Sequence, residues 1–166
     1  MPLVKESRIV DDRFIRIDDE AAVPETGAVI VSGGRYLAEA AALSMRTEPT
    51  GVVWPNDRPI AELAPYVGHL ALISLVFPKF RDGRAFSQAR LLRERFGYRG
   101  ELRATGEVLR DQFLFMLRAG FDSFEVAKPA DAAAFAEAVK RYDVFYQPTG
   151  DGRITALRQR LALRRA

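Results

Sequence analysis

Cysteine is absent from this chain of 166 residues, and histidine occurs once, at His69. Without cysteine the protein can form no disulfide, offer no thiolate nucleophile and hold no cysteine-ligated iron–sulfur cluster. A zinc site would need carboxylates around a single imidazole, which is an unusual ligand set. The sequence also lacks the dinucleotide-binding G-x-G-x-x-G motif, the phosphate-binding P-loop and the G-x-S-x-G motif of hydrolases. We therefore predict no metal and no cofactor, and we assign no catalytic residue.

Long apolar runs and a strong charge imbalance are missing as well. Hydrophobic residues make up 48% of the chain and charged residues 28%, with a net charge of +3. No run approaches the roughly 20 apolar residues that span a bilayer, and the first residues show no apolar signal region. We expect a cytoplasmic protein without a membrane segment. The length suits one α/β domain over 1–166, with a less regular part over about 1–50 and a basic tail over about 151–166.

Segments typical of strands and of helices alternate along the chain. Strand patterns cover 12–19, 27–34, 51–55, 70–78, 100–105, 121–127 and 144–148. Helical patterns cover 35–46, 57–67, 83–96, 107–119 and 131–142. Asp57 and Asp82 are expected as N-caps, and Gly97 and Gly120 as the glycines that follow helix ends. The alternation predicts an α/β protein with a mainly parallel sheet built of βα repeats.

Two architectures fit this alternation: an open doubly wound sheet, or a run of βα units that resembles half of a (βα)₈ barrel. Glu101, Arg103 and Thr105 alternate with apolar residues along one predicted strand, as Ser123 and Glu125 do along the next. A parallel strand covered on both faces should not carry charges in alternation. We favour the half-barrel, whose interior can be polar, and we expect an ion pair between Arg103 and Glu125.

The predicted helix 107–119 is apolar on nearly all sides. Its apolar residues are too many for one stripe: Val108, Leu109, Phe113, Leu114, Phe115, Met116 and Leu117. A helix of this kind is buried twice, once by its own sheet and once by another layer. That layer is either the interior of a monomer or a second protomer, and we predict a homodimer.

The C-terminal sequence RITALRQRLALRRA contains part of the excess positive charge. Ile154, Leu157 and Leu161 can share one face of a helix there, with the arginines mostly elsewhere. Such a segment suits docking on an acidic partner or on nucleic acid, or it is a frayed, solubilising tail. No aromatic residue lies among the arginines, which argues against nucleic acid.

Charged residues gather in the loops that follow the predicted strands. Ligands of parallel α/β proteins bind at the carboxyl ends of the strands, where helix N-termini meet. The loop PKFRDGR brings Lys79, Arg81 and Arg84 to this edge, and we predict that they bind a small oxyanion. Further polar residues expected at this edge, as helix caps or as the rim of the site, are Asn56, Asp57, Asp82, Gly83, Thr105, Glu107, Arg110, Asp111 and Lys128.

The same charges also allow a purely structural interpretation. The arginines can pair with Asp82, Glu107 or Asp111, and Asp82 can simply cap its helix. Glu107 and Asp111 lie four residues apart, as the paired acids of a hydrolase can, but Arg110 beside them favours an ion-pair cluster.

Three segments, FPKFRDGR, GELRATGEVLRDQ and RAGFDSF, together resemble the signature region of a bacterial family of short proteins, domain of unknown function nine-three-four. The resemblance is dense from about Gly51 to Phe124. Glu107 stands where the family pattern has Asp, which preserves a capping or ion-pair role but not a fixed carboxylate position. The resemblance implies a genomic association with assimilatory sulfite reductase and supplies no catalytic residues.

We therefore expect an accessory protein of assimilatory sulfite reduction that binds the reductase or a related sulfur-assimilation protein, its anionic substrate, or both. The alternative is a cofactor-independent enzyme acting on a small anionic metabolite, with Asp82, Glu107 or Asp111 as acid or base.

Overall fold

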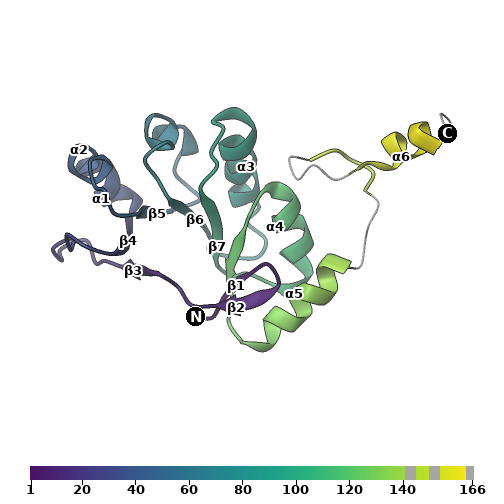
Figure 1. Cartoon of the computed structure of the whole chain (residues 1–166), viewed down its shortest axis with the longest axis horizontal. Coiled ribbons are helices and arrows are strands. Elements are labelled where there is room, and N and C mark those ends of the chain that lie inside the picture. Colours follow the sequence, from purple (N-terminus) through teal and green to yellow (C-terminus); the bar gives the residue numbers. More distant parts are fainter. Residues whose placement is uncertain (141–144, 150–153, 164–166) are drawn as a thin grey trace.

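The computed structural model describes residues 1–140, 145–149 and 154–163 (Figure 1). Its eight-stranded sheet has the order β2-β1-β8-β7-β6-β5-β4-β3. The strands are β1 Leu3–Lys5, β2 Arg8–Val10, β3 Phe14–Arg16, β4 Ala28–Ser32, β5 Thr50–Trp54, β6 Leu72–Phe77, β7 Glu101–Gly106 and β8 Ser123–Glu125. Strands β3 to β8 pair in parallel, while β1 runs antiparallel to both β8 and β2. The sheet curls into a half-barrel with helices between its strands, which confirms the predicted fold.

Helices cover the convex side of this sheet, except the last one, which projects from the body (Figure 1). They are α1 Gly33–Ala38, α2 Ala40–Ser44, η1 Ile60–Tyr66, α3 Arg84–Arg90, η2 Leu91–Arg95, η3 Arg110–Gln112, α4 Phe113–Ala119, α5 Ala130–Lys140 and α6 Ala156–Leu163. Within the described ranges, no helix has the length and apolar character needed to cross a membrane.

Three predicted helix starts lie too early in the sequence. The second helix begins at Ile60 as a 3₁₀ helix with Pro59, not Asp57, at its N-cap, because the two prolines restrict the backbone before and inside it. The third begins at Arg84 with Gly83 at its N-cap, so Asp82 lies one residue further out. The fourth begins only at Phe113, after a 3₁₀ turn that follows the extended residue Leu109.

The two ends of the chain differ most from expectation. An N-terminal hairpin, β1–β2, was not predicted, since its turn uses Glu6 (φ 50°) and Ser7 (φ 63°) instead of the usual asparagine or glycine. The predicted strand 144–148 begins outside the described residues, and Phe145 forms only an isolated bridge with Thr155. The sheet has no place for a further strand beside β8, because β1 occupies that edge.

The core consists of two apolar clusters, one on each face of the sheet. The large convex cluster joins Trp54 and Phe77 to the helices, and it includes the aromatic group Phe113, Phe124 and Phe135 with ring centroids 4.7 to 5.5 Å apart. The small concave cluster is formed by Phe14, Ala28, Ile30 and Leu72, mostly from β3, β4 and β6. The concave side of β7 and β8 is polar, so the interior of the half-barrel is apolar at one end of the sheet and charged at the other.

The open side of the half-barrel is crossed by the chain itself. Strands β2 and β3 are the two edges of the sheet, yet only residues 11–13 separate them in sequence. This linking segment carries Asp12 over the concave face toward Arg103 of β7. We call this opening, spanned by residues 11–13, the seam.

Candidate functional site

Six charged side chains form a network inside the half-barrel. The acids are Asp12, Glu101 and Glu125, and the cations are Arg103, Lys5 and Arg16. Equal numbers of both signs leave the network with no formal net charge. The alternation along β7 and β8 places Glu101, Arg103 and Glu125 on the concave face, where the sequence pattern expected polar groups.

Arg103 is the centre of this network and is only 1% exposed. Its guanidinium binds Asp12 through two bonds, Nη1–Oδ2 at 2.6 Å and Nη2–Oδ1 at 3.0 Å. Glu101 Oε1 accepts from Nε at 3.2 Å and from Nη2 at 3.0 Å, while Glu125 Oε1 lies 3.4 Å from Nη1. The expected partner Glu125 is thus the most distant of three carboxylates, and Asp12, reached through the seam, is the closest.

Each carboxylate of the network also has a second partner. Glu101 accepts from Lys5 Nζ at 3.0 Å and from Ser123 Oγ at 2.7 Å. Glu125 accepts from Thr105 Oγ1 at 2.6 Å and from Arg16 Nη2 at 3.2 Å. Thr105, expected with the rim residues, therefore lies inside the half-barrel.

These contacts set the protonation of the buried groups. Burial would raise the pKa of Glu101, but hydrogen bonds from Ser123, Lys5 and Arg103 outweigh it and hold that pKa below its usual value. Burial likewise acts to raise the pKa of Asp12, and the bonds from Arg103 and from the Phe14 N–H lower it further than burial raises it. The charged groups of the network have their hydrogen-bond partners within it. This arrangement fits a structural role in closing the seam better than a role in catalysis.

The second polar region is the carboxyl edge, where the loop 78–84 follows β6. Gly106 ends the neighbouring strand β7 at φ +92°, and a Cβ there would lie 2.3 Å from the carbonyl oxygen of Phe77. Only glycine permits this close crossing. The crossing brings Glu107 beside the loop, where its Oε2 accepts from the Phe80 N–H at 2.8 Å.

The loop is fixed from both neighbouring elements. Besides Glu107, Gln112 of η3 donates from Nε2 to the Phe80 carbonyl at 3.0 Å. The Asp82 N–H donates to the Lys79 carbonyl at 2.9 Å and closes a turn. The backbone is therefore anchored, while the side chains of Lys79, Phe80 and Arg81 are exposed.

Arg84 differs from the other two cations of the loop. Its Nη2 lies 2.6 Å from Asp82 Oδ2, its Nε lies 2.9 Å from Oδ1, and its N–H donates to Oδ1 at 3.2 Å. The bond from Arg84 lowers the pKa of Asp82, and the same bond raises the pKa of Arg84. Within residues 1–140, 145–149 and 154–163, Lys79 and Arg81 have no ion-pair partner, so they are the open cations of the predicted anion site.

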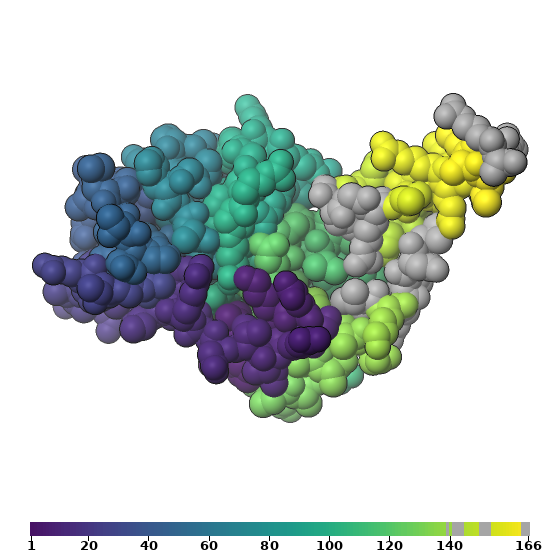
Figure 2. All heavy atoms as spheres, in the orientation of Figure 1, coloured from purple at the N-terminus to yellow at the C-terminus, as the bar shows by residue number. Residues whose placement is uncertain are grey.

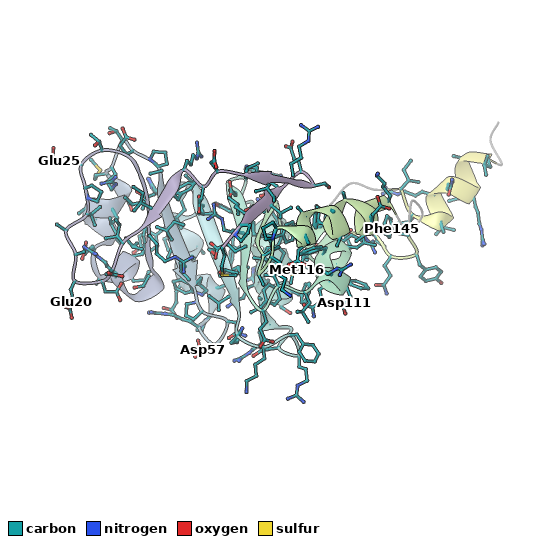
Figure 3. All side chains as sticks on the ribbon, turned by 90° about the horizontal axis from the view of Figure 1, so that it is seen from below. Glu20, Glu25, Asp57, Asp111, Met116 and Phe145 are labelled. Carbon is teal, nitrogen blue, oxygen red and sulfur yellow. The ribbon has the colours of Figure 1, made fainter. Side chains whose placement is uncertain are left out.

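The remaining predicted rim residues lie on the loop after β7 or further away. Arg110 and Asp111 are exposed on η3, and Asp111 is seen on the helical layer in Figure 3. Asn56 is buried after β5, close enough to Asp82 to help lower its pKa, although its Nδ2 has no acceptor within hydrogen-bond distance in the described part of the chain. Lys128 is exposed after β8. Nowhere in the described ranges do three or more His, Asp or Glu side chains come together to hold a metal ion.

Sequence reasoning missed several residues that the structure brings together. The polar alternation of β7 and β8 indicated the charged interior, but Asp12, Lys5 and Arg16 join it only through the curl of the sheet. Phe80 and Gln112 carry no motif; their role follows from the anchoring of the loop.

Comparison with known proteins gives one match. Residues 51–157 match the family described as "Bacterial protein of unknown function (DUF934)". A search of curated proteins and a search of solved structures found no match. The matched segment covers β5 to α5 and reaches into α6, and thus includes the anchored loop and the charged strands β7 and β8. Because the match extends over more than half of its length, the chain belongs to this bacterial family of unknown function.

Proposed function

We propose that this protein is an accessory factor of assimilatory sulfite reduction that docks on an acidic surface of a protein partner through Lys79, Phe80 and Arg81. The link to sulfite reduction comes from the family resemblance, which implies association with the assimilatory sulfite reductase. That reductase is therefore the candidate partner. The docking role comes from the geometry of the loop.

The observation that carries the proposal is the anchored loop itself. Glu107 and Gln112 hold both polar backbone groups of Phe80, yet its ring is 51% exposed. An apolar ring that keeps half of its surface in water, between two cations, is available for contact with a partner. An aromatic side chain flanked by positive charge on a rigid backbone has the composition of an interface anchor. A rigid loop also loses little conformational entropy on binding, which favours affinity.

A small oxyanion is a second candidate ligand at the same place. Lys79 and Arg81 are open, but Arg84 is neutralised by Asp82, so two cations remain of the three expected. The two cations flank the exposed ring of Phe80 on the sequence, an arrangement that suits an extended acidic surface better than a single small ion. Asp82 and Glu107 are both engaged in holding the loop, which leaves the enzymatic alternative without support from the geometry.

Binding of the purified chain to purified assimilatory sulfite reductase tests the proposal. We expect binding that weakens with rising salt, and a loss of about tenfold or more in affinity for Lys79→Glu/Arg81→Glu. Phe80→Ala should increase the dissociation rate. Arg99→Glu is the matched control, because Arg99 is exposed and lies before β7, at the opposite edge of the sheet.

Two results would count against docking at this loop. One is the absence of binding by the wild-type chain at low salt. The other is an equal loss of affinity in the Arg99 control, which would indicate nonspecific attraction. Calorimetric titration with sulfite and sulfate tests the small-anion candidate separately, and binding that Arg81→Ala removes would support it.

A further inference from the structure

The C-terminal arm, residues 145–149 and 154–163, presents apolar side chains to solvent. In α6, Leu157 is 66% exposed and Leu161 50% exposed, and Ile154 before the helix is exposed as well. The arm projects from the body of the molecule (Figures 1 and 2). A helix of eight residues is too short to be stable alone in water, where about 12–15 residues are needed. The apolar face of α6 therefore calls for a surface to pack on.

The base of the arm is attached to the body. Phe145 is buried and lies under the guanidinium of Arg118, 4.1 Å from the ring centroid, where the arm leaves the helical layer (Figure 3). It forms a β-bridge with Thr155, and the Ala156 N–H donates to the Phe145 carbonyl at 2.8 Å. The bridge holds the two parts of the arm together, and the contact of Phe145 with Arg118 ties the arm to the body.

A groove between α4 and α5 has apolar lining residues that could receive the apolar face of α6. Its volume is about 670 Å³, and its floor and walls include Leu114 and Phe115, the latter 64% exposed. Apart from Glu137, the facing side of α5 contributes small side chains, namely Ala130, Ala133, Ala134 and Ala138. Alanines at this spacing let another helix approach closely, while Phe115 offers a large apolar contact.

The charges at the groove complement those of the arm. Asp111 and Glu137 line the groove together with Arg110, and all three are exposed. Glu137 also lies 3.6 Å from Lys140 Nζ, so Asp111 is the groove acid that has no ion-pair partner in the described part of the chain. Arg158 and Arg160 on α6 are exposed and, in the described part of the chain, have no ion-pair partner. Opposite charges placed around apolar contacts favour one orientation of the docked helix.

We propose that α6 of one copy of this chain occupies the α4–α5 groove of a second copy, and that the exchange is reciprocal. Leu157 and Leu161 would pack against Phe115 and the alanines of α5, with Arg158 and Arg160 near Asp111 and Glu137. A two-fold dimer then contains the contact twice, and each copy both gives and receives an arm. The proposal does not depend on the docking loop, although η3 borders both: Gln112 anchors the loop, and Arg110 and Asp111 line the groove.

Cross-linking between single-cysteine variants tests the exchange, and the absence of native cysteine removes any background. Full-length Ala134→Cys and Leu157→Cys chains, carrying tags of different mass, are mixed and oxidised. We expect a heterodimeric disulfide product that joins the two tags. Met45→Cys replaces Ala134→Cys in the control, because Met45 is 83% exposed and follows α2, which lies at the other end of the sheet from α4 and α5 (Figure 1).

Light scattering of variants provides the second measurement. The wild-type chain should have the mass of a dimer, and each of Leu157→Asp and Leu161→Asp should weaken dimerisation by about tenfold or more. Ala134→Arg should do the same by filling the groove. A mixture of Leu157→Asp/Leu161→Asp chains with Ala134→Arg chains should recover dimers, because one intact arm can meet one intact groove.

Circular dichroism confirms that each variant is folded before its mass is interpreted. A monomeric wild-type mass at every concentration would overturn the proposal. So would a dimer in which the Ala134–Leu157 pair forms no more cross-link than the Met45 control, or one in which the two blocked variants fail to associate when mixed.

Discussion

Replacing Arg103 by methionine removes the guanidinium that lies between Asp12, Glu101 and Glu125. Glu101 keeps Lys5 and Glu125 keeps Arg16, but Asp12 loses both of its bidentate bonds. Methionine fills much of the vacated volume, so the cost is mainly electrostatic. Removing one partner of a buried ion pair costs about 3–5 kcal/mol, and we expect Arg103→Met to lower the free energy of unfolding by about this amount.

A double variant distinguishes charge from packing. Arg103→Met/Asp12→Leu removes the stranded carboxylate and leaves two balanced pairs inside the half-barrel. We expect it to be at least about 1–2 kcal/mol more stable than Arg103→Met alone. Asp12 is about one-third exposed, so the recovery falls short of what a fully buried pair would give. Urea denaturation measures all three free energies, with the exposed Arg99→Met as the control, expected to change stability by less than about 0.5 kcal/mol.

The response to pH gives an independent reading of the same network. The pKa values of Asp12 and Glu101 are lowered in the folded protein, so their stabilisation is present above the unfolded values of 3.8 and 4.5 and is lost as pH falls through the folded values. In Arg103→Met, Asp12 loses its arginine partner, so the pKa of Asp12 in the folded protein should rise. The stability difference between wild type and variant should therefore shrink as pH is lowered toward 4.

Two findings would refute this reasoning about the network. The first is an Arg103→Met chain as stable as the Arg99→Met control. The second is a double variant no more stable than Arg103→Met alone.

Three further predictions follow from single contacts. Gly106→Ala should lower stability by at least about 1–3 kcal/mol, since its Cβ would meet a backbone carbonyl, whereas Gly83→Ala has room for a methyl group; urea denaturation of both compares them. Phe135→Ala should cost about 3–5 kcal/mol by removing a buried ring that packs on two others, and calorimetry should show a lower melting temperature. Glu107→Ala should speed hydrogen exchange at the Phe80 amide, while Glu107→Gln, which keeps an acceptor, should have a smaller effect. Unchanged exchange in Glu107→Ala would contradict the anchoring of the loop.

The alternation of strands and helices could be predicted from the sequence because each signal was local. Continuous apolar residues in β6, Pro55 after β5 and the φ-positive glycines Gly97 and Gly120 each follow from neighbouring residues alone. The polar alternation of β7 and β8 even indicated a wet interior and hence the curl of the sheet.

The residues that close this polar interior could not be predicted from local sequence patterns. Asp12 contacts Arg103 only because β2 and β3 end at opposite edges of a curved sheet, which no local pattern encodes. The same applies to Gln112, which was assigned to a continuous helix. In the structure it belongs to a 3₁₀ turn whose side chain reaches the Phe80 carbonyl. The pairing of Arg84 with Asp82 was one of two open interpretations, and the sequence offers no reason to prefer it.

The seam has a consequence for the way the chain is made. Strand β1 is synthesised well before β8, with which it pairs, and Arg16 binds Glu125, which lies 109 residues later in the sequence. The amino-terminal hairpin must therefore remain without its partner strand while β4 to β7 are synthesised and assembled in order. During that interval the backbone groups of β1 that later pair with β8 have no strand partner. A circularly permuted gene that places the hairpin after β8 should shorten the interval between synthesis of the hairpin and its pairing with β8. We expect the final step of folding to become faster.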